Sequence, residues 1–339
     1  MPWAPNRKTT YQFLAIPTLV ALAGCSSTGG SSGSGGGGGG RPPPAADPAY
    51  YAADVGTMQQ AMDAGLEMNA YDEAMSVFML SDQNANERSD GGFVDFAMLK
   101  NADGSYTVTN DDKSITYAED DADPYDDTGN FTEFGFESDD GDNNVYNHTA
   151  TLEEFATGSG GPHYLSVWRY FWQDGPGTDY TGMAVIGAET RAEDVIEQAN
   201  ATYSGRSEVS MFTTTDPDDW DRTTISGDLD LAADFAAGSI SGGVSSLERE
   251  DRVGGITGPR SAINGAIAFE GGSIAGNSFG GDLSFSGFDA DDTFGADPNS
   301  YDGAYAGKFY GPNADEVGGV VTVNGTDVTG NGFFAADKD

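Results

Sequence analysis

The side chains that could carry metal or redox chemistry are few in this sequence. It holds one cysteine, Cys25, and two histidines, His148 and His163. A single cysteine permits neither an internal disulfide nor a cluster of thiolate metal ligands. An imidazole can ligate a metal or haem iron or act as a general base. The surroundings of each histidine therefore decide which of these chemistries is open to the chain.

His163 stands near the start of an aromatic-rich run, whereas His148 lies in a polar stretch. If the run is a strand, four aromatic side chains fall on one face, namely Tyr164, Trp168, Tyr170 and Trp172. Such a face could stack on a flat cofactor, but it more often packs into the core of a domain. Haem binding through His163 is therefore the minor hypothesis, and no other cofactor is indicated.

Two acidic runs, residues 119–127 and 139–142, could offer carboxylate oxygens to calcium. Neither run has the spaced Asp, Asn, Gly and terminal Glu of an EF-hand loop. Solvated loops are the favoured interpretation, although calcium binding stays open. We assign no metal ligands from the sequence.

Residues 276–280 match the Gly-x-Ser-x-Gly string of a nucleophile elbow centred on Ser278. That chemistry requires a turn from a strand into a helix and a histidine partner. Here an alternating β-pattern flanks the string on both sides, and both histidines lie far upstream. No nucleophile, base and orienting group can be assembled elsewhere either, so we expect no enzyme.

The charge balance bears on the class of partner. The chain has 15 Lys and Arg against 55 Asp and Glu, a formal net charge of −40. Nucleic-acid binding by phosphate neutralisation needs clustered cations and is excluded. A surface adapted to salty or crowded surroundings explains the acidity better than a preference for cationic partners.

The first 24 residues have the pattern of an export signal, with cations at Arg7 and Lys8 and an apolar run over 13–23. The run is shorter than the about 20 residues that span a bilayer, so we predict a cleaved signal. Residues 22–25, Leu-Ala-Gly-Cys, resemble the lipobox of bacterial lipoproteins. This resemblance implies cleavage before Cys25 and attachment of fatty acyl chains such as palmitate to its thiol.

A Gly-, Ser- and Pro-rich segment, residues 25–48, follows the predicted cleavage point. Its composition cannot bury a core, so we expect a flexible tether. By the same resemblance, Ser26 favours the outer membrane, since aspartate at that position is the usual signal for inner-membrane retention. The lipid on Cys25 would then hold the folded part at the outer membrane, and we expect it on the cell surface.

From residue 198 onward, alternating apolar and polar residues between Gly, Asp and Asn predict antiparallel strands. We count eight of them, over residues 201–209, 225–235, 239–244, 263–269, 273–279, 283–285, 301–309 and 317–323. Eight strands suit a closed barrel filled by side chains, and inward glycines opposite aromatics permit tight coiling. The outward positions are Asp, Ser, Asn and Lys, which favours a soluble barrel over a lipid-facing one.

One run within this region is specific enough to suggest a family. Residues 307–319, Gly-Lys-Phe-Tyr-Gly-Pro-Asn-Ala-Asp-Glu-Val-Gly-Gly, resemble the C-terminal signature of transferrin-binding protein B-like lipoproteins. Residues 187–190 and 201–205 resemble the phrases that precede and open the same barrel. We interpret the signature as a strand through Phe309, a turn at 311–313 and a return strand from Val317, with Glu316 at its start. As such it marks the fold and not a pocket.

The region before the barrel, residues 49–197, is predicted to be a mixed, mostly β domain. A methionine-rich helix is expected from Val55 through Leu66, with a possible continuation to Met75. Its methionines suit core packing better than a promiscuous binding surface. Asn101 to Gly104 predicts a hairpin between residues 93–99 and 105–109.

The expected organisation is a signal peptide (1–24), a tether (25–48), a handle-like domain (49–197) and an antiparallel barrel (198–339). The resemblance implies a binding module for an iron- or haem-bearing protein or a solute. It also implies a TonB-dependent transporter and a surface-lipoprotein translocator as partners. The alternative is a structural or adhesive envelope lipoprotein that uses the same barrel without iron, and fold analogy alone does not choose between them.

Overall fold

The chain divides into two compact units, residues 1–37 and 38–339, and every described residue lies in the second. The computed structural model describes residues 51–80, 92–110, 113–117, 138–139, 145–146, 150–155, 163–173, 178–213, 222–253, 256–289, 298–325 and 328–339. Cys25, His148 and the acidic run 119–127 lie outside this part, as does all of the run 139–142 except Asp139.

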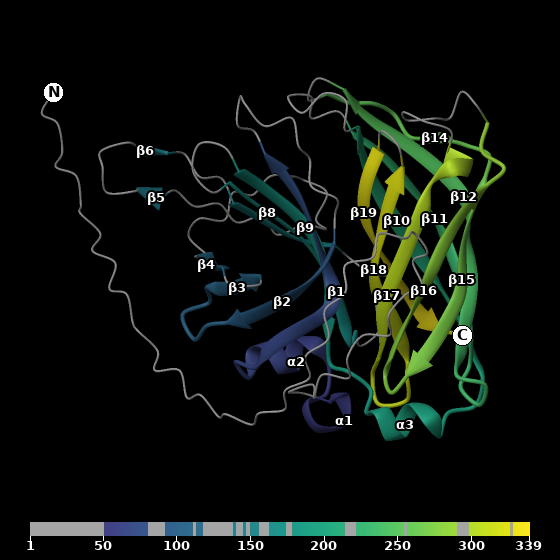
Figure 1. Ribbon diagram of the computed structural model, residues 1–339. Coiled ribbons are helices and arrows are strands. Elements are labelled where there is room, and N and C mark those ends of the chain that lie inside the picture. Colours follow the sequence, from purple (N-terminus) through teal and green to yellow (C-terminus); the bar gives the residue numbers. More distant parts are fainter. Residues whose placement is uncertain are drawn as a thin grey trace, which may run out of the picture. The chain divides into compact units, whose positions relative to one another are not determined.

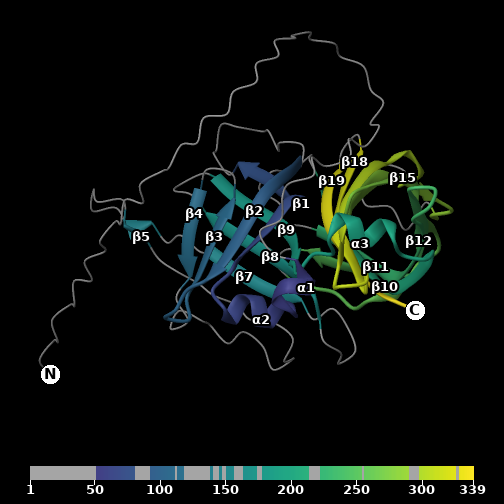
Figure 2. The same cartoon turned by 90° about the horizontal axis from the view of Figure 1, so that it is seen from below.

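The C-terminal half forms a closed antiparallel barrel of eight strands. These are β10 (Ala201–Thr213), β11 (Arg222–Asp234), β12 (Ser239–Val253), β15 (Ala266–Ala275), β16 (Ser278–Ser286), β17 (Asp302–Tyr310), β18 (Glu316–Gly325) and β19 (Val328–Lys338). Their order is β11-β10-β19-β18-β17-β16-β15-β12, and pairing of β11 with β12 closes the ring, which Figure 2 shows end-on. Two short strands, β13 (Ile256–Thr257) and β14 (Ser261–Ala262), pair with β12.

The barrel interior follows from the alternation in the sequence. Along β11, Leu229, Leu231 and Ala233 are buried, whereas Asp228 and Asp230 are exposed. Inward glycines face aromatic rings, as predicted: an added Cβ on Gly319 would lie 2.7 Å from the Phe334 ring. The mainly β class and the closed eight-stranded barrel are thereby confirmed.

One of the eight strands predicted from the sequence is not a single strand in the structure. Residues 273–279 are the β15–β16 hairpin, because the chain reverses at Gly276, whose φ of +66° suits glycine. The eighth strand is β19, which pairs with β10 and β18. The alternation was therefore correct in this segment, but a tight turn within it was missed.

A seven-stranded antiparallel sheet precedes the barrel in sequence (Figure 1). Its order is β4-β3-β2-β1-β9-β8-β7. The strands are β1 (Glu67–Leu80), β2 (Gly92–Lys100), β3 (Tyr106–Asn110), β4 (Lys113–Tyr117), β7 (Ala150–Phe155), β8 (Leu165–Gln173) and β9 (Thr178–Gly187), and β5 (Ser138–Asp139) pairs with β6 (Val145–Tyr146). The predicted hairpin is present as β2 and β3, joined through Asn101 to Gly104.

The helices are short: α1 (Ala52–Val55), α2 (Met58–Asp63), α3 (Ala192–Ile196) and a 3₁₀ turn, η3 (Pro298–Ser300). The single helix expected from Val55 is wrong, because Gly56, at φ +83°, ends α1 and a capping box of Thr57 and Gln60 starts α2. Its continuation toward Met75 is also wrong, since that segment is β1. Within the described residues, no helix is long and apolar enough to cross a membrane.

The methionine stripe nevertheless packs as predicted. Met58, Met62 and Met68 are buried in one cluster with Trp168. The interpretation as core packing is therefore correct for these three side chains, although they come from a helix and a strand and not from one helix.

Candidate functional site at the junction of the two sheets

The outer wall of the barrel packs against the seven-stranded sheet through an apolar cluster. Val320, Phe333 and Ala335 alternate with the inward residues of β18 and β19, so their side chains point out of the barrel. They are nevertheless buried, together with Tyr310 of β17, against Leu165 and Val167 of β8 and Met183 and Val185 of β9. We call this contact region, with its polar flanks, the junction.

Three glutamates at the junction are the only buried carboxylates among the described residues. Glu189, Glu208 and Glu316 are 3%, 6% and 5% exposed. A buried carboxylate is costly unless partners compensate its charge and satisfy its oxygens. The partners of these three residues therefore show how the two sheets are joined.

Glu189 lies in the segment after β9 and contacts the barrel in two ways. Its Oε1 accepts a hydrogen bond from Lys308 Nζ at 2.8 Å, and its Oε2 accepts one from Asn277 Nδ2 at 2.7 Å. Both Glu189 and Lys308 are buried, so the ion pair is shielded from solvent. The backbone of Glu189 also bridges to Tyr310.

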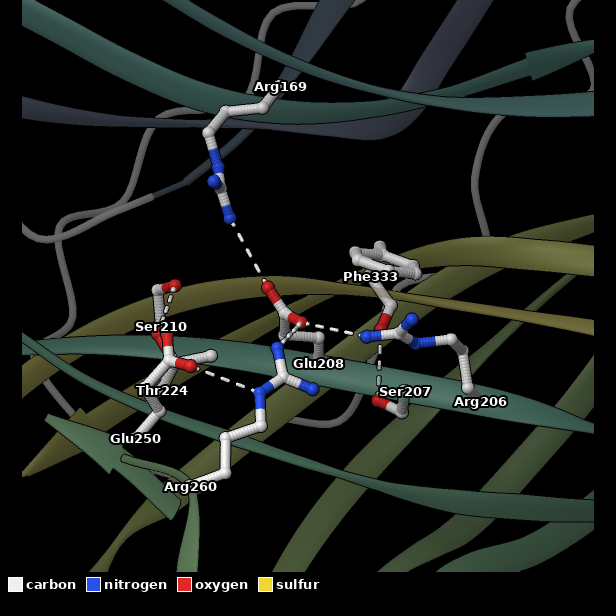
Figure 3. A network of polar contacts seen from close by, with 9 residues as sticks. All are labelled: Arg169, Arg206, Ser207, Glu208, Ser210, Thr224, Glu250, Arg260 and Phe333. Carbon is white, nitrogen blue, oxygen red and sulfur yellow. Dashed lines mark hydrogen bonds and ion pairs between the residues drawn. The ribbon is translucent and has the colours of Figure 1, made fainter. Parts of the chain in front are cut away.

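Glu208 projects outward from β10 into a set of arginines (Figure 3). Arg169 reaches it from β8, with Nη2 3.3 Å from Oε1, and Arg206 Nη2 lies 3.0 Å from Oε2. Arg260 is more distant, at 4.0 Å, and pairs with Glu250 at 3.1 Å. The Arg169 contact joins the two sheets, and the other two arginines add positive charge around the carboxylate.

Glu316 opens β18 and binds the backbone at the start of β8. Its Oε2 accepts hydrogen bonds from the N–H groups of Tyr164 and Leu165 at 2.9 and 2.8 Å. Its Oε1 lies 3.3 Å from Nδ1 of His163. Burial raises the pKa of the Glu316 carboxyl, and the nearby charge of Asp337 acts in the same direction. The neutral form is therefore favoured more than in water.

The three sequence runs that resemble the family meet at this junction. Thr190 donates its hydroxyl to the carbonyl of Gly311 at 2.6 Å. Tyr203 donates its hydroxyl to the carbonyl of Ala314 at 3.0 Å. The turn predicted at 311–313 is present, and the signature does more than mark the fold, because Lys308 and Glu316 within it bind residues that precede the barrel in sequence.

The structure separates the predicted site residues. Tyr164 precedes β8 and packs at the junction, whereas Trp168 is buried in the cluster with Met58. The single aromatic face proposed for a flat cofactor is therefore wrong for this pair. Ser278 begins β16 after a hairpin turn, is buried and has Asn277 Oδ1 at 3.5 Å, so the local backbone is not that of a nucleophile elbow.

Several residues of the junction could not be identified from the sequence. Glu189, Glu208 and Asp337 are three acids among 55, and only the fold brings them to their partners. The alternation along β17 gives one indication of the junction. It places Lys308 on the outward face of the barrel next to apolar outward residues such as Tyr310, and apolar outward residues indicate that another part of the protein covers this face.

Comparison with solved structures finds matches of low sequence identity, and the following three all have TM-scores below 0.5. The isotype 1 transferrin binding protein B of serogroup B Neisseria meningitidis is 16% identical, with a TM-score of 0.42, over 78% of this chain and 43% of that one. A double mutant of the same protein from Haemophilus parasuis Hp5 is 16% identical, with a TM-score of 0.40, over 80% of this chain and 45% of that one. The N-lobe domain of lactoferrin binding protein B of Moraxella bovis is 13% identical, with a TM-score of 0.29, over 78% and 99% of the two chains. The chain thus spans less than half the length of the first two.

Comparison with curated proteins finds no match. A family model described as the C-lobe and N-lobe beta barrels of transferrin-binding protein B matches residues 196–338. The matched residues coincide with the eight strands that close the barrel, from Ala201 to Lys338. Residues 196–338 are therefore a β-barrel domain of the transferrin-binding protein B type.

Proposed function

We propose that this protein is an outer-membrane lipoprotein that binds a partner protein at the cell surface. The observation that carries the proposal is the family match over the whole barrel. Solved proteins of similar fold are named for binding transferrin and lactoferrin. The proposed partner here is an iron- or haem-bearing protein, with a TonB-dependent transporter in the same membrane as the recipient of its iron.

The proposed anchor is the acylated thiol of Cys25. Each buried methylene group adds about 0.8 kcal/mol of membrane affinity, so two or more acyl chains give stable attachment. The Gly-, Ser- and Pro-rich residues 26–48 then act as a spacer between the lipid and the folded part. A surface-lipoprotein translocator would carry the protein to the outer leaflet.

The contacts at the junction support a binding role because they hold two β-sheets together as one scaffold. A scaffold whose elements keep their geometry loses little conformational entropy when it binds. The Glu189–Lys308 and Glu208–Arg169 pairs both join the barrel to the preceding domain. Loops at the ends of such a scaffold are well placed for recognition.

One loop end offers an apolar contact. Val253, the last residue of β12, pairs with Ile256, the first of β13, and their side chains are 59% and 77% exposed. They are two of the three large apolar side chains that are exposed within the described residues. Neighbouring exposed apolar side chains offer a surface that a protein partner could cover. We propose that this tip contacts the partner.

The test is a binding titration of the full-length protein in detergent against iron-loaded transferrin, iron-loaded lactoferrin and haemoglobin. We expect one of the three to bind, and Val253→Ser with Ile256→Ser to weaken that binding at least about tenfold, the loss of roughly 1.4 kcal/mol. The matched control is Ile196→Ser, which removes an exposed apolar side chain from α3. Failure of all three probes, together with expression that ignores iron, would favour the structural or adhesive alternative.

A further inference from the structure

Three side chains with metal-binding atoms converge at one edge of the junction. His163 precedes β8, Glu316 opens β18 and Asp337 lies near the end of β19. Their ligand atoms, one from each residue, all lie within 4.8 Å of one another. Glu316 is buried, His163 is partly buried and Asp337 is exposed, so the group is open to solvent on one side.

The two carboxylates are held close together by strand register. Glu316 and Asp337 are direct partners across the β18–β19 ladder. Like charges directly opposite each other on neighbouring strands are destabilising. The neighbouring Lys338 directs its Nζ to the carbonyl of Asn313 at 3.0 Å and to Gln198 Oε1 at 3.4 Å. A bound cation would remove this repulsion.

The two carboxylate oxygens of Glu316 make different contacts, and this arrangement also suits a metal ligand. Oε2 accepts two backbone hydrogen bonds, which fix the carboxylate, while Oε1 is turned toward His163. Hydrogen bonds to the second oxygen of a ligating carboxylate are a common feature of metal sites. The carboxylate is therefore oriented by the start of β8 before any ion arrives.

The distance between the ligand atoms of His163 and Glu316 fits a zinc site. Two ligand atoms about 2.0–2.1 Å from a tetrahedral zinc ion are about 3.3–3.4 Å apart. His163 Nδ1 and Glu316 Oε1 are 3.3 Å apart. The ligand atom of Asp337 lies within 4.8 Å of the other two, and its exposed side chain would have to move closer to complete the set. One imidazole and two carboxylates form a borderline donor set, which zinc accepts and calcium, with its preference for oxygen, does not.

We propose that His163, Glu316 and Asp337 bind one zinc ion, with water in the fourth position. The ion joins the start of β8 to two barrel strands and so fastens the seven-stranded sheet to the barrel. Its binding stabilises the folded state by mass action, because the unfolded chain does not bring these three residues together.

The experiment is a calorimetric titration of the detergent-solubilised full-length protein with zinc chloride, after chelator treatment and with excess Mg²⁺ to occupy weak carboxylate sites. We expect one site and a higher melting temperature with zinc, both reversed by chelator. His163→Gln and Asp337→Asn should each weaken binding more than about 100-fold, since even outer-shell changes cost 10- to 100-fold. Melting temperatures in chelator, close to wild type, confirm that the variants fold.

The matched control is His148→Gln, which removes the only other histidine. It should leave the zinc affinity unchanged, and in the nuclear magnetic resonance spectrum zinc should shift the imidazole signal that His163→Gln removes. The proposal is overturned if His163→Gln and Asp337→Asn bind zinc like wild type, if the shifted imidazole belongs to His148, or if calcium displaces zinc from the site.

Discussion

Replacing Lys308 by methionine should lower the free energy of unfolding by about 3–5 kcal/mol, the usual cost of breaking a buried ion pair from one side. Lys308 Nζ is 2.8 Å from Glu189 Oε1, and both side chains are almost fully buried. The variant keeps most of the length of the side chain but removes the positive charge that faces the Glu189 carboxylate. Only the hydrogen bond from Asn277 would remain to compensate it. Denaturant unfolding followed by circular dichroism measures the change.

Two controls separate this effect from a general loss of charge. Lys100→Met breaks the exposed pair with Asp63 and should cost clearly less than Lys308→Met, because solvent screens an exposed ion pair. Adding Glu189→Gln to Lys308→Met removes the uncompensated charge and should recover a large part of the loss. If Lys308→Met costs as little as Lys100→Met, the ion pair does not hold the junction together.

The second large effect is expected one residue further along the same strand. Phe309 points into the barrel, is fully buried and contacts Tyr203, Phe235 and Phe279, with ring centroids 6.1, 5.2 and 5.0 Å away. Phe309→Ala should destabilise the protein by about 3–5 kcal/mol, through lost apolar burial and the cavity that remains. The same unfolding measurement applies.

Phe309→Leu is the graded control, because it keeps most of the apolar volume and should cost clearly less than alanine. If the two variants are equally unstable, the cavity is not the cause. If neither is destabilised, the aromatic cluster is not the centre of the barrel core. Neighbouring residues 308 and 309 therefore test the two faces of β17 independently.

The barrel could be predicted because its signal is local. Inward residues such as Leu229 and Leu231 alternate with Asp228 and Asp230 along one strand, and a period of two can be seen without knowing any neighbour. The missed turn at Gly276 and the missed helix end at Gly56 have a common cause. Each depends on a glycine with positive φ, and glycine is too frequent in this chain, at 49 residues, to mark every turn.

The junction could not be predicted because its contacts join distant parts of the chain. Glu189 and Lys308 are 119 positions apart, and His163 and Glu316 are 153 apart. His163 was singled out from the sequence for its rarity, but its partners Glu316 and Asp337 became visible only through the β18–β19 register. Because the chain has 55 acidic residues, the sequence does not show which of them lie next to His163 in the fold.

The most direct test of a surface binding module is protease treatment of intact cells. Full-length protein should be digested from outside, while a periplasmic marker in the same cells stays intact. Cys25→Ser, which removes the acylated thiol, should release the protein from the membrane fraction and abolish its display on the cell surface. Full protection of the wild-type protein in intact cells, with digestion only after lysis, would contradict the account.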